Sequence, residues 1–185
     1  YEIMPSLVGS EMCIRDSYYY DGRWNQVAQA MVNHYEIKSG DKILDVGCGK
    51  GFLLYEFTKI VPGVEVVGLD ISSYAIENSK PEVRDFLIEG HAKKLPFDDD
   101  YFDLVVTNMT LHNLKVNDLF DSVREISRVM KNKAWIGLES YRNESEKANL
   151  LYWQLTCESF YDPEEWLWIY KQCGYDADYE FLVFE

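Results

Sequence analysis

The sequence predicts an α/β protein built on a doubly wound, mostly parallel sheet. Short apolar runs of strand length alternate along the chain with longer runs in which apolar residues recur at helical spacing. Because the strands are apolar along nearly their whole length, helices should cover both faces of the sheet. A glycine-rich turn directly follows the first strand. Ligands of such sheets bind beyond the carboxyl ends of the strands, so the glycines place the expected site at that edge.

Three strands and three helices are expected in the first half of the chain. Val27, Met31 and Tyr35 recur at helical spacing in the first helix, which should pack on the sheet beside the glycine turn. Alternatively, the aromatic residues Tyr19, Tyr20 and Trp24 could roof the ligand. Ser72 is a suitable N-cap for the third helix, and Pro81 stops it. The expected strands span residues 42–46, 65–70 and 85–90, and the expected helices span residues 25–37, 52–61 and 72–80.

The second half continues this alternation up to residue 140. Asp162 followed by Pro163 predicts a helix start, and Gly174 predicts the end of that helix. A sheet of this type usually carries one strand more, so we expect either a reduced sheet or a truncated chain. The expected strands span residues 102–108, 133–140 and 179–184, and the other helices span residues 116–131 and 148–160.

Residues 141–166 break the regular pattern, and we expect them to form a helical insertion that covers the substrate. Its aromatic side chains could act as a lid that excludes water. They could equally form the core of a helical pair or a dimer surface. The aromatic residues in question are Tyr152, Trp153, Phe160 and Tyr161.

Length and composition fit one domain, which we place at residues 18–185. The chain has 185 residues, 47% of them hydrophobic, which is enough to bury a core. Its formal net charge of −14 argues against binding nucleic acid or an anionic membrane through clustered Lys and Arg. No run approaches the roughly 20 apolar residues of a membrane span. The four cysteines are scattered without a C-x-x-C pair, which favours a reducing, cytoplasmic location.

Residues 1–17 show neither helical nor strand periodicity. The stretch from Met4 to Ser17 resembles the peptide that results when sequencing-adapter DNA is translated at the edge of an assembled fragment. We therefore expect a non-native leader without a function; the alternative is a short N-terminal arm.

The glycine turn reads Asp45-Val-Gly-Cys-Gly-Lys-Gly51, with a glycine at every second position. Glycine tolerates positive φ and lets a ligand approach the main chain, and the helix behind the turn presents unpaired N–H groups. A dinucleotide fingerprint would need its third glycine at position 52, which is Phe. A phosphate-binding loop would need Lys directly after Gly51, where Phe52 again stands. The turn therefore fits neither of these nucleotide sites.

The spacing instead resembles the first motif of the class I S-adenosylmethionine-dependent methyltransferases, an acid followed by three alternating glycines. Further stretches between residues 40 and 140 resemble this family in the same order. An apolar strand ends in Asp70, a Gly-x-Ala run precedes Leu-Pro-Phe, a strand begins with Phe-Asp, and a helix carries Glu-x-x-Arg-Val. On these motifs the chain is identified as a member of that family, with S-adenosylmethionine as its cofactor. The stretches are residues 66–72, 90–97, 102–108 and 125–130.

The resemblance implies a cofactor-binding role for ten residues. Asp70 should bind both ribose hydroxyls, because a carboxylate accepts two hydrogen bonds with fixed geometry. His91 stands where the family usually has Asp for the exocyclic amine of adenine, and its neutral ring could accept from that amine. Alternatively, His91 points to solvent and the main chain of Ala92 makes this contact. The ten residues are Asp45, Gly47, Cys48, Gly49 and Gly51 in the turn, Asp70 and Ile71 after the second strand, His91 and Ala92 after the third, and Asn108 after the fourth.

The acceptor side is expected after the fourth and fifth strands. His112 is the candidate general base, because its ordinary pKa lies near neutrality and an alcohol loses a proton as it attacks. It could instead cap the next helix. Arg142 would suit an acceptor carboxylate or phosphate, or it could form a surface salt bridge. The remaining expected substrate residues are Asn113, Glu139 and Tyr141.

We therefore expect methyl transfer from S-adenosylmethionine to a small-molecule acceptor, with oxygen favoured over nitrogen. Residues 139–144 and 150–158 resemble uncharacterised bacterial methyltransferases associated with surface-sugar biosynthesis. Two alternatives stay open: a catalytically silent subunit that binds the cofactor, and an NAD-dependent oxidoreductase, which Phe52 disfavours. No metal is expected, because the carboxylates of residues 98–100 precede the fourth strand, away from the acceptor.

Overall fold

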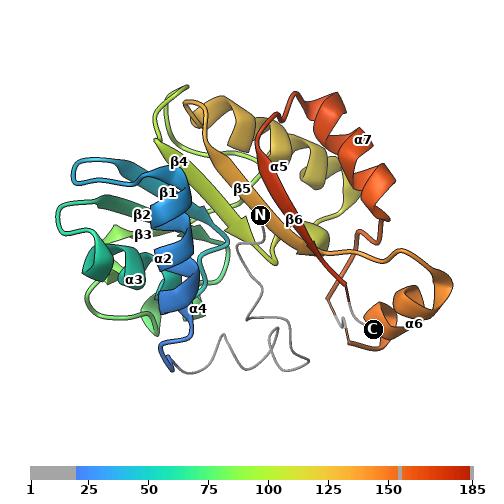
Figure 1. Cartoon of the computed structure of the whole chain (residues 1–185), viewed down its shortest axis with the longest axis horizontal. Coiled ribbons are helices and arrows are strands. Elements are labelled where there is room, and N and C mark those ends of the chain that lie inside the picture. Colours follow the sequence, from blue (N-terminus) through green and yellow to red (C-terminus); the bar gives the residue numbers. More distant parts are fainter. Residues whose placement is uncertain (1–19, 154–155, 184–185) are drawn as a thin grey trace.

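The sheet has six parallel strands in the order β3-β2-β1-β4-β5-β6 (Figure 1). The computed structural model describes residues 20–153 and 156–183, without the side chain of Trp153, so the expectations for residues 1–17 and for Trp153 lie outside it. The parallel sheet confirms the predicted doubly wound α/β class. The strands are β1 (Lys42–Val46), β2 (Glu65–Asp70), β3 (Leu87–Glu89), β4 (Leu104–Asn108), β5 (Ala134–Glu139) and β6 (Asp178–Leu182).

Helices cover both faces of this sheet. In Figure 1, α2 and α3 gather over the β1–β3 half, and α5 and α7 lie over β5 and β6. No helix in the described ranges is both long and apolar enough to cross a membrane. The α-helices are α2 (Trp24–Tyr35), α3 (Phe52–Ile60), α4 (Ser73–Glu77), α5 (Val116–Val129), α6 (Glu144–Trp153) and α7 (Pro163–Cys173), and the short 3-10 helices are η1 (Arg84–Phe86) and η2 (Leu111–Asn113).

Two apolar cores hold the layers together, one on each face of the sheet. Ile43 of β1 belongs to the core with Met31 of α2 and Phe57 of α3. Its neighbour Leu44 belongs to the opposite core with Trp166 of α7. Successive side chains of a strand point to opposite faces, which explains why a strand buried on both sides is apolar throughout. The sheet is therefore a rigid base, and the loops after its strands are left to build a site.

Most predicted bounds agree with the structure to within two residues, and the predicted caps are present. Ser72 accepts a hydrogen bond from the main-chain N–H of Ala75 at the start of α4. Asp162 forms a capping box with Glu165, and Gly174 ends α7 in the left-handed conformation. These local motifs act through neighbouring residues, so the sequence is sufficient to place them.

Two elements of the first half are shorter than predicted. Residues 84–86 form η1, which leaves only three residues for β3. The helix α4 ends at Glu77, because Asn78 turns back and its Nδ2 donates to the carbonyl oxygen of Tyr74 at 2.8 Å. Pro81 therefore lies beyond the helix end rather than at it.

The helix predicted at residues 148–160 was wrongly placed, since α6 spans Glu144–Trp153. Asn143 Oδ1 accepts the main-chain N–H of Glu146 at 3.0 Å, which is the geometry of a helix N-cap. The start of α6 was missed because residues 141–147 are polar. A polar stretch has no apolar periodicity from which a helix can be predicted.

Residues 156–162 are not helical, because they are tied to the loop after β4. The main-chain N–H groups of Glu158 and Ser159 donate to the carbonyl oxygen of His112 at 2.9 and 3.0 Å. Ser159 Oγ also donates to the carbonyl oxygen of Leu114 at 2.7 Å. These long-range bonds bring the insertion to the edge of the sheet where the site is expected.

Candidate active site

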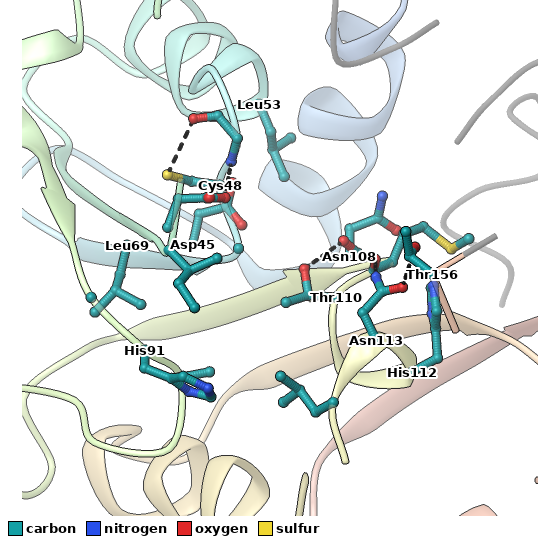
Figure 2. A pocket seen from close by; sticks show the side chains of 18 of the residues that line it. Asp45, Cys48, Leu53, Leu69, His91, Asn108, Thr110, His112, Asn113 and Thr156 are labelled. Carbon is teal, nitrogen blue, oxygen red and sulfur yellow. Dashed lines mark hydrogen bonds between the residues drawn. The ribbon is translucent and has the colours of Figure 1, made fainter. Parts of the chain in front are cut away.

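A cavity of about 670 Å³ opens at the carboxyl ends of β1, β2 and β4 (Figure 2). The cavity is lined by residues of the glycine turn, the ends of β2 and β4, the loop after β3, η2, the start of α5 and part of residues 156–158. The sequence-predicted residues that line it are Asp45, Gly47, Cys48, Gly49, Asp70, Ile71, His91, Ala92, Asn108, His112 and Asn113. Those that do not are Gly51, Glu139, Tyr141 and Arg142.

The glycine turn brings its main chain to the cavity at Gly49. Gly49 has φ +52°, and a Cβ there would meet no atom within 4 Å. Gly47 is different: with φ +80°, its Cβ would lie 2.0 Å from Oγ1 of Thr110, in the loop after β4. Its N–H donates to the carbonyl oxygen of Leu69 at 2.7 Å. Gly47 thus permits close packing of the turn, and Gly49 leaves an accessible main chain.

Gly51 supports the helix rather than the cavity. It is the N-cap of α3 with φ +71°, and a Cβ would lie 2.9 Å from Cγ2 of Val83. The N–H of Tyr55 donates to its carbonyl oxygen at 2.9 Å, which begins the helix. The geometry therefore gives Gly51 a structural role, in contrast to the cofactor contact expected from the motif.

The carboxylate of Asp70 is held by two main-chain groups. The N–H of Gly49 donates to Oδ2 at 2.7 Å, and the N–H of Ser72 donates to Oδ1 at 2.8 Å. Each carboxylate oxygen has two acceptor positions, so each keeps one for a further donor. Asp70 can therefore accept two more hydrogen bonds without changing its position.

Asp45 is buried beside Asp70, with 4% of its surface exposed. Burial, reinforced by the charge of Asp70, raises the pKa of Asp45 to about 7. Burial also raises the pKa of the neighbouring Cys48 thiol far above its ordinary value. The thiol therefore stays protonated, which makes it a poor nucleophile and a small neutral wall of the cavity.

His91 is tied to neighbouring groups through both ring nitrogens. Its Nδ1 accepts the main-chain N–H of Lys93 at 3.2 Å, and its Nε2 lies 3.4 Å from Oδ2 of Asp118. Two expectations were given for His91: an acceptor for adenine, and a side chain that points to solvent. In the structure the ring is instead held between Lys93 and Asp118. Asp118, from the first turn of α5, lines the cavity as well.

His112 lies in η2 and is only 2% exposed. Burial lowers its pKa to about 4, so the ring is neutral at physiological pH. Its Nδ1 has no hydrogen-bond partner within the described part of the chain. The alternative of a cap for the next helix is not supported, because Lys115 is the N-cap of α5 and no side chain caps it. A buried polar atom without a protein partner needs an explanation, and an ordered water or a ligand in the cavity would supply one.

Polar side chains surround His112 at this side of the cavity, as Figure 2 shows. Asn113 Nδ2 donates to the carbonyl oxygen of Met109 at 3.2 Å, and Asn113 Oδ1 accepts from Thr156 Oγ1 at 2.8 Å. Asn108 Oδ1 is buried without a partner in the described ranges. Met109 itself has φ +54°, a strained conformation for a residue with a side chain. The loop after β4 is thus bent so that several polar groups reach one place.

The three substrate residues expected after β5 lie elsewhere. Glu139 and Tyr141 are buried, with 3% and 8% of their surfaces exposed, and neither lines the cavity. The guanidinium of Arg142 pairs with Glu146 four residues later, with Nη2 2.6 Å from Oε1. A salt bridge was the alternative expectation for Arg142, although only the guanidinium is at the surface and Glu146 is buried. Strand β5 therefore contributes less to the site than the motif order suggested.

Several cavity residues carried no recognisable sequence signal. Trp24 is an exception, because it was one of three aromatic residues that could roof the ligand. It reaches the cavity from the first residue of α2, whereas Tyr20 does not line the cavity and Tyr19 lies outside the described residues. Asp118 occupies the first turn of a helix, where an acid is common for electrostatic reasons alone. Only the tertiary structure places these side chains together, because they lie far apart in the chain. The other lining residues without a prediction include Lys50, Leu53, Met109, Thr110, Lys115, Thr156 and Glu158.

Comparison with known proteins agrees with this geometry. The sequence profile of the family described as methyltransferase domain matches residues 44–138, just over half of the chain. A demethylmenaquinone methyltransferase of Staphylococcus saprophyticus is 35% identical over 106 residues, which are 55% of this chain and 45% of the relative. The chain thus spans a little less than half the length of this relative.

Solved structures share the fold at low sequence identity. The YcgJ protein of Bacillus subtilis superposes with a TM-score of 0.65 at 22% identity, over 79% of this chain and 66% of that one. The cyclase SpnF superposes with a TM-score of 0.64 at 17% identity, over 80% of this chain and 57% of that one. These likenesses establish the fold, and the sequence match establishes the family. The chain therefore belongs to the methyltransferase domain family of class I S-adenosylmethionine-dependent methyltransferases.

Proposed function

We propose that the protein transfers the methyl group of S-adenosylmethionine to a small-molecule acceptor in the cavity at the carboxyl ends of β1, β2 and β4. One observation carries this proposal: the same cavity holds an open glycine turn beside the carboxylates of Asp45 and Asp70, and two buried polar atoms that have no hydrogen-bond partner among the described residues. The turn and the carboxylates suit the cofactor. The unpartnered atoms, on His112 and Asn108, suit an acceptor.

The residues around the glycine turn fit the cofactor chemically. The open main chain at Gly49 lets a ligand approach, and Asp70 keeps two acceptor positions for ribose hydroxyls. Asp45 has a pKa raised to about 7, so a nearby positive charge would favour its ionised form. When bound, the cofactor supplies a methyl group on a positively charged sulfonium, which needs no further activation. The protein then has to align the acceptor and exclude water.

His112 would orient the acceptor together with Asn108, to which the motif order had given a cofactor contact instead. Asn108 Oδ1 is an obligatory hydrogen-bond acceptor, and a neutral imidazole accepts through one of its two nitrogens. An acceptor with hydroxyl groups matches both atoms, so we propose oxygen as the methylated atom. His112 would take up the hydroxyl proton as the oxygen attacks, because burial keeps the ring neutral and ready to accept.

Two acceptor classes are supported by different observations. The resemblance of residues 139–144 and 150–158 to chains associated with surface sugars supports a sugar hydroxyl. The name of the demethylmenaquinone methyltransferase relative supports a quinol-like acceptor. The methyl group of a menaquinone is on a ring carbon, so with this class the loss of the hydroxyl proton would activate the ring and carbon would be the methylated atom. A base with a pKa of about 4 is better matched to an acidic phenol or quinol than to an aliphatic hydroxyl. This match makes the quinol-like class the first to test.

We further propose that residues 141–166 cover the acceptor through residues 156–158 within a single domain at residues 18–185. Thr156 and Glu158 line the cavity. The described aromatic side chains of the insertion do not line the cavity: Tyr152 is 87% exposed, and Tyr161 packs edge-on against buried Trp166, with ring centroids 5.2 Å apart. A cytoplasmic location is supported by the free thiols of the cysteines in the described part of the chain.

A calorimetric titration with S-adenosylhomocysteine and NAD, followed by an acceptor screen, tests the proposal. We expect S-adenosylhomocysteine to bind and NAD not to bind. Incubation with S-adenosylmethionine and a panel of phenols, quinols, sugars, nucleotide sugars and small acids should release S-adenosylhomocysteine with one acceptor class. Binding without release across the whole panel would favour the catalytically silent subunit. Binding of NAD alone would favour an oxidoreductase.

A further inference from the structure

The side of the cavity formed by β2 and β3 carries a carboxylate that belongs to neither strand. These two strands pair in parallel register, so the loops that follow them lie at the same edge of the sheet. Ile71, His91 and Ala92 come from these loops and line the cavity together with Asp70. Asp118 joins them from the first turn of α5. The cavity wall beyond Asp70 is thus mainly apolar, with one carboxylate in it.

His91 offers no free hydrogen-bond acceptor to this part of the cavity. Its Nδ1 already accepts the main-chain N–H of Lys93 at 3.2 Å. In the neutral ring the proton is therefore on Nε2, which lies 3.4 Å from Oδ2 of Asp118. A hydrogen-bond donor on a ligand must find its acceptor elsewhere in the wall.

Asp118 has acceptor capacity left for such a donor. Nζ of Lys93 lies 3.1 and 3.2 Å from its two oxygens, and His91 faces Oδ2. A carboxylate has about four acceptor positions, and these contacts use three of them. The carboxylate is also held in place from two sides, which reduces the cost of ordering it around a ligand.

We infer that Asp118 recognises the exocyclic amine of the cofactor's adenine, with His91 as the positioning residue for its carboxylate. This inference rests on the proposed function and deepens it, because it names the group that distinguishes adenine from other bases. With the ribose at Asp70, the flat base lies along the apolar side chains of Ile71 and Ala92 and reaches Asp118. The amine donates to the carboxylate. A carbonyl oxygen at the same position of the base would face the lone pairs of the carboxylate oxygens, so no hydrogen bond could form.

The test compares S-adenosylhomocysteine with S-inosylhomocysteine, which has a carbonyl in place of the amine, by isothermal titration calorimetry. The wild-type protein should prefer the adenosyl compound. In Asp118→Asn we expect adenosyl binding to weaken about tenfold, as for the loss of a hydrogen bond to a charged group. Because an amide can also donate to the carbonyl, inosyl binding should be equal or tighter. Asp121→Asn, on the same helix but outside the cavity, should leave both affinities unchanged.

Three further variants separate recognition from folding. Lys93→Ala removes the ion pair but keeps the carboxylate, so it should retain the preference for the adenosyl compound. His91→Ala should reduce this preference, and His91→Gln should restore it, because its amide N–H can donate to Asp118. Melting curves of all variants show whether the fold is kept.

The outcomes distinguish the inference from the proposed function. If the wild-type protein binds neither compound, cofactor binding in this cavity is refuted and the inference fails with it. If the wild-type protein binds the adenosyl compound and Asp118→Asn keeps the same preference, only the role of Asp118 is refuted. Equal weakening of both compounds in Asp118→Asn would likewise show that the residue is structural.

Discussion

The main-chain N–H of Gly49 donates to Oδ2 of Asp70 at 2.7 Å, which ties the glycine turn after β1 to the carboxyl end of β2. The N–H of Ser72 fixes the other carboxylate oxygen at 2.8 Å. The turn and the carboxylate are therefore arranged relative to each other without a ligand, and binding does not have to order them. Because the turn is fixed in this way, substitutions of two of its glycines, Gly49 and Gly47, should have different effects.

Gly49→Ala should impair cofactor binding while it leaves the fold largely intact. The new Cβ would meet no protein atom within 4 Å, but it would lie at the cavity wall. The left-handed conformation adds a cost of roughly 1–2 kcal/mol for a residue with a side chain. We expect S-adenosylhomocysteine affinity to fall at least about tenfold in calorimetry, with a modest fall in Tm.

Gly47→Ala is the matched variant. Its Cβ would lie 2.0 Å from Oγ1 of Thr110, so the loop after β4 must move. This variant should lose far more stability than Gly49→Ala in a thermal melt. Normal binding by Gly49→Ala, or equal Tm values for the two variants, would contradict the roles given to these glycines.

Asp45 should make binding of the positively charged cofactor depend on pH. Its pKa is raised to about 7 by burial and by the charge of Asp70, so it gains a negative charge as pH rises through this range. Binding of S-adenosylmethionine should therefore tighten between pH 6 and 8. S-adenosylhomocysteine, which lacks the positive charge on sulfur, should show a weaker trend. Calorimetry of both compounds at several pH values measures the difference.

Asp45→Asn provides the control for this pH effect. The folded-state pKa of Asp45 is raised, so its contribution to stability is present at low pH and is lost as pH rises through about 7. The neutral amide should thus raise Tm relative to wild type at pH 8 more than at pH 5. It should also remove the difference in pH trend between the two compounds. If the difference in pH trend persists in Asp45→Asn, it must arise from another titrating group.

His112 should affect stability in the opposite direction. Its folded-state pKa of about 4 lies below the ordinary value of 6.5, so the unfolded chain binds the extra proton between these values. The stabilising contribution of the neutral ring is present above pH 6.5 and is lost as pH falls towards 4. From pH 7 to pH 5 the loss is about 2 kcal/mol.

His112→Gln should therefore show a smaller fall in the free energy of unfolding between pH 7 and 5 than wild type, measured by urea denaturation. The same His112 variant should lower turnover much more than cofactor affinity once an acceptor is known. If the free energy of unfolding changed with pH in the same way in wild type and in His112→Gln, the inference that the buried ring is neutral would be refuted.

The fold was largely predictable because its determinants are local. The parallel strands follow from continuous apolar runs such as residues 42–46, and α7 follows from the Asp162 cap and Gly174. The positions of the candidate cofactor residues were predictable for the same reason, since Asp45 to Gly49 and Asp70 lie at the carboxyl end of a predicted strand or directly after it. A residue at the carboxyl end of a parallel strand is positioned by the strand itself.

The acceptor side was predicted less well because its positions depend on long-range contacts. Arg142 and Glu139 were expected in the cavity from chain order alone, yet Arg142 is drawn to Glu146 in the next helix. Glu158 reaches the cavity only because its N–H donates to the carbonyl oxygen of His112, 46 residues earlier in the chain. Single-sequence periodicity contains no information about such a bond.

Glu56 links the start of the described chain to the cavity through a buried polar cluster. This α3 carboxylate is fully buried and accepts hydrogen bonds from Tyr20, from Asn25 Nδ2 at 2.7 Å and from Lys59 Nζ at 3.0 Å. Tyr20 and Asn25 flank Trp24, which lines the cavity. Glu56 should therefore hold the first turn of α2 in the position that brings Trp24 to the ligand.

Glu56→Gln tests this link, because it keeps the size of the side chain but replaces one acceptor oxygen by a donor. Three donors would then compete for one acceptor, and we expect a loss of roughly 2 kcal/mol in the free energy of unfolding. Affinity for S-adenosylhomocysteine should fall as Trp24 loses its support. Glu77→Gln, at an exposed position of α4, should change neither quantity. If Glu56→Gln loses stability but binds with wild-type affinity, the cluster stabilises the fold without positioning Trp24.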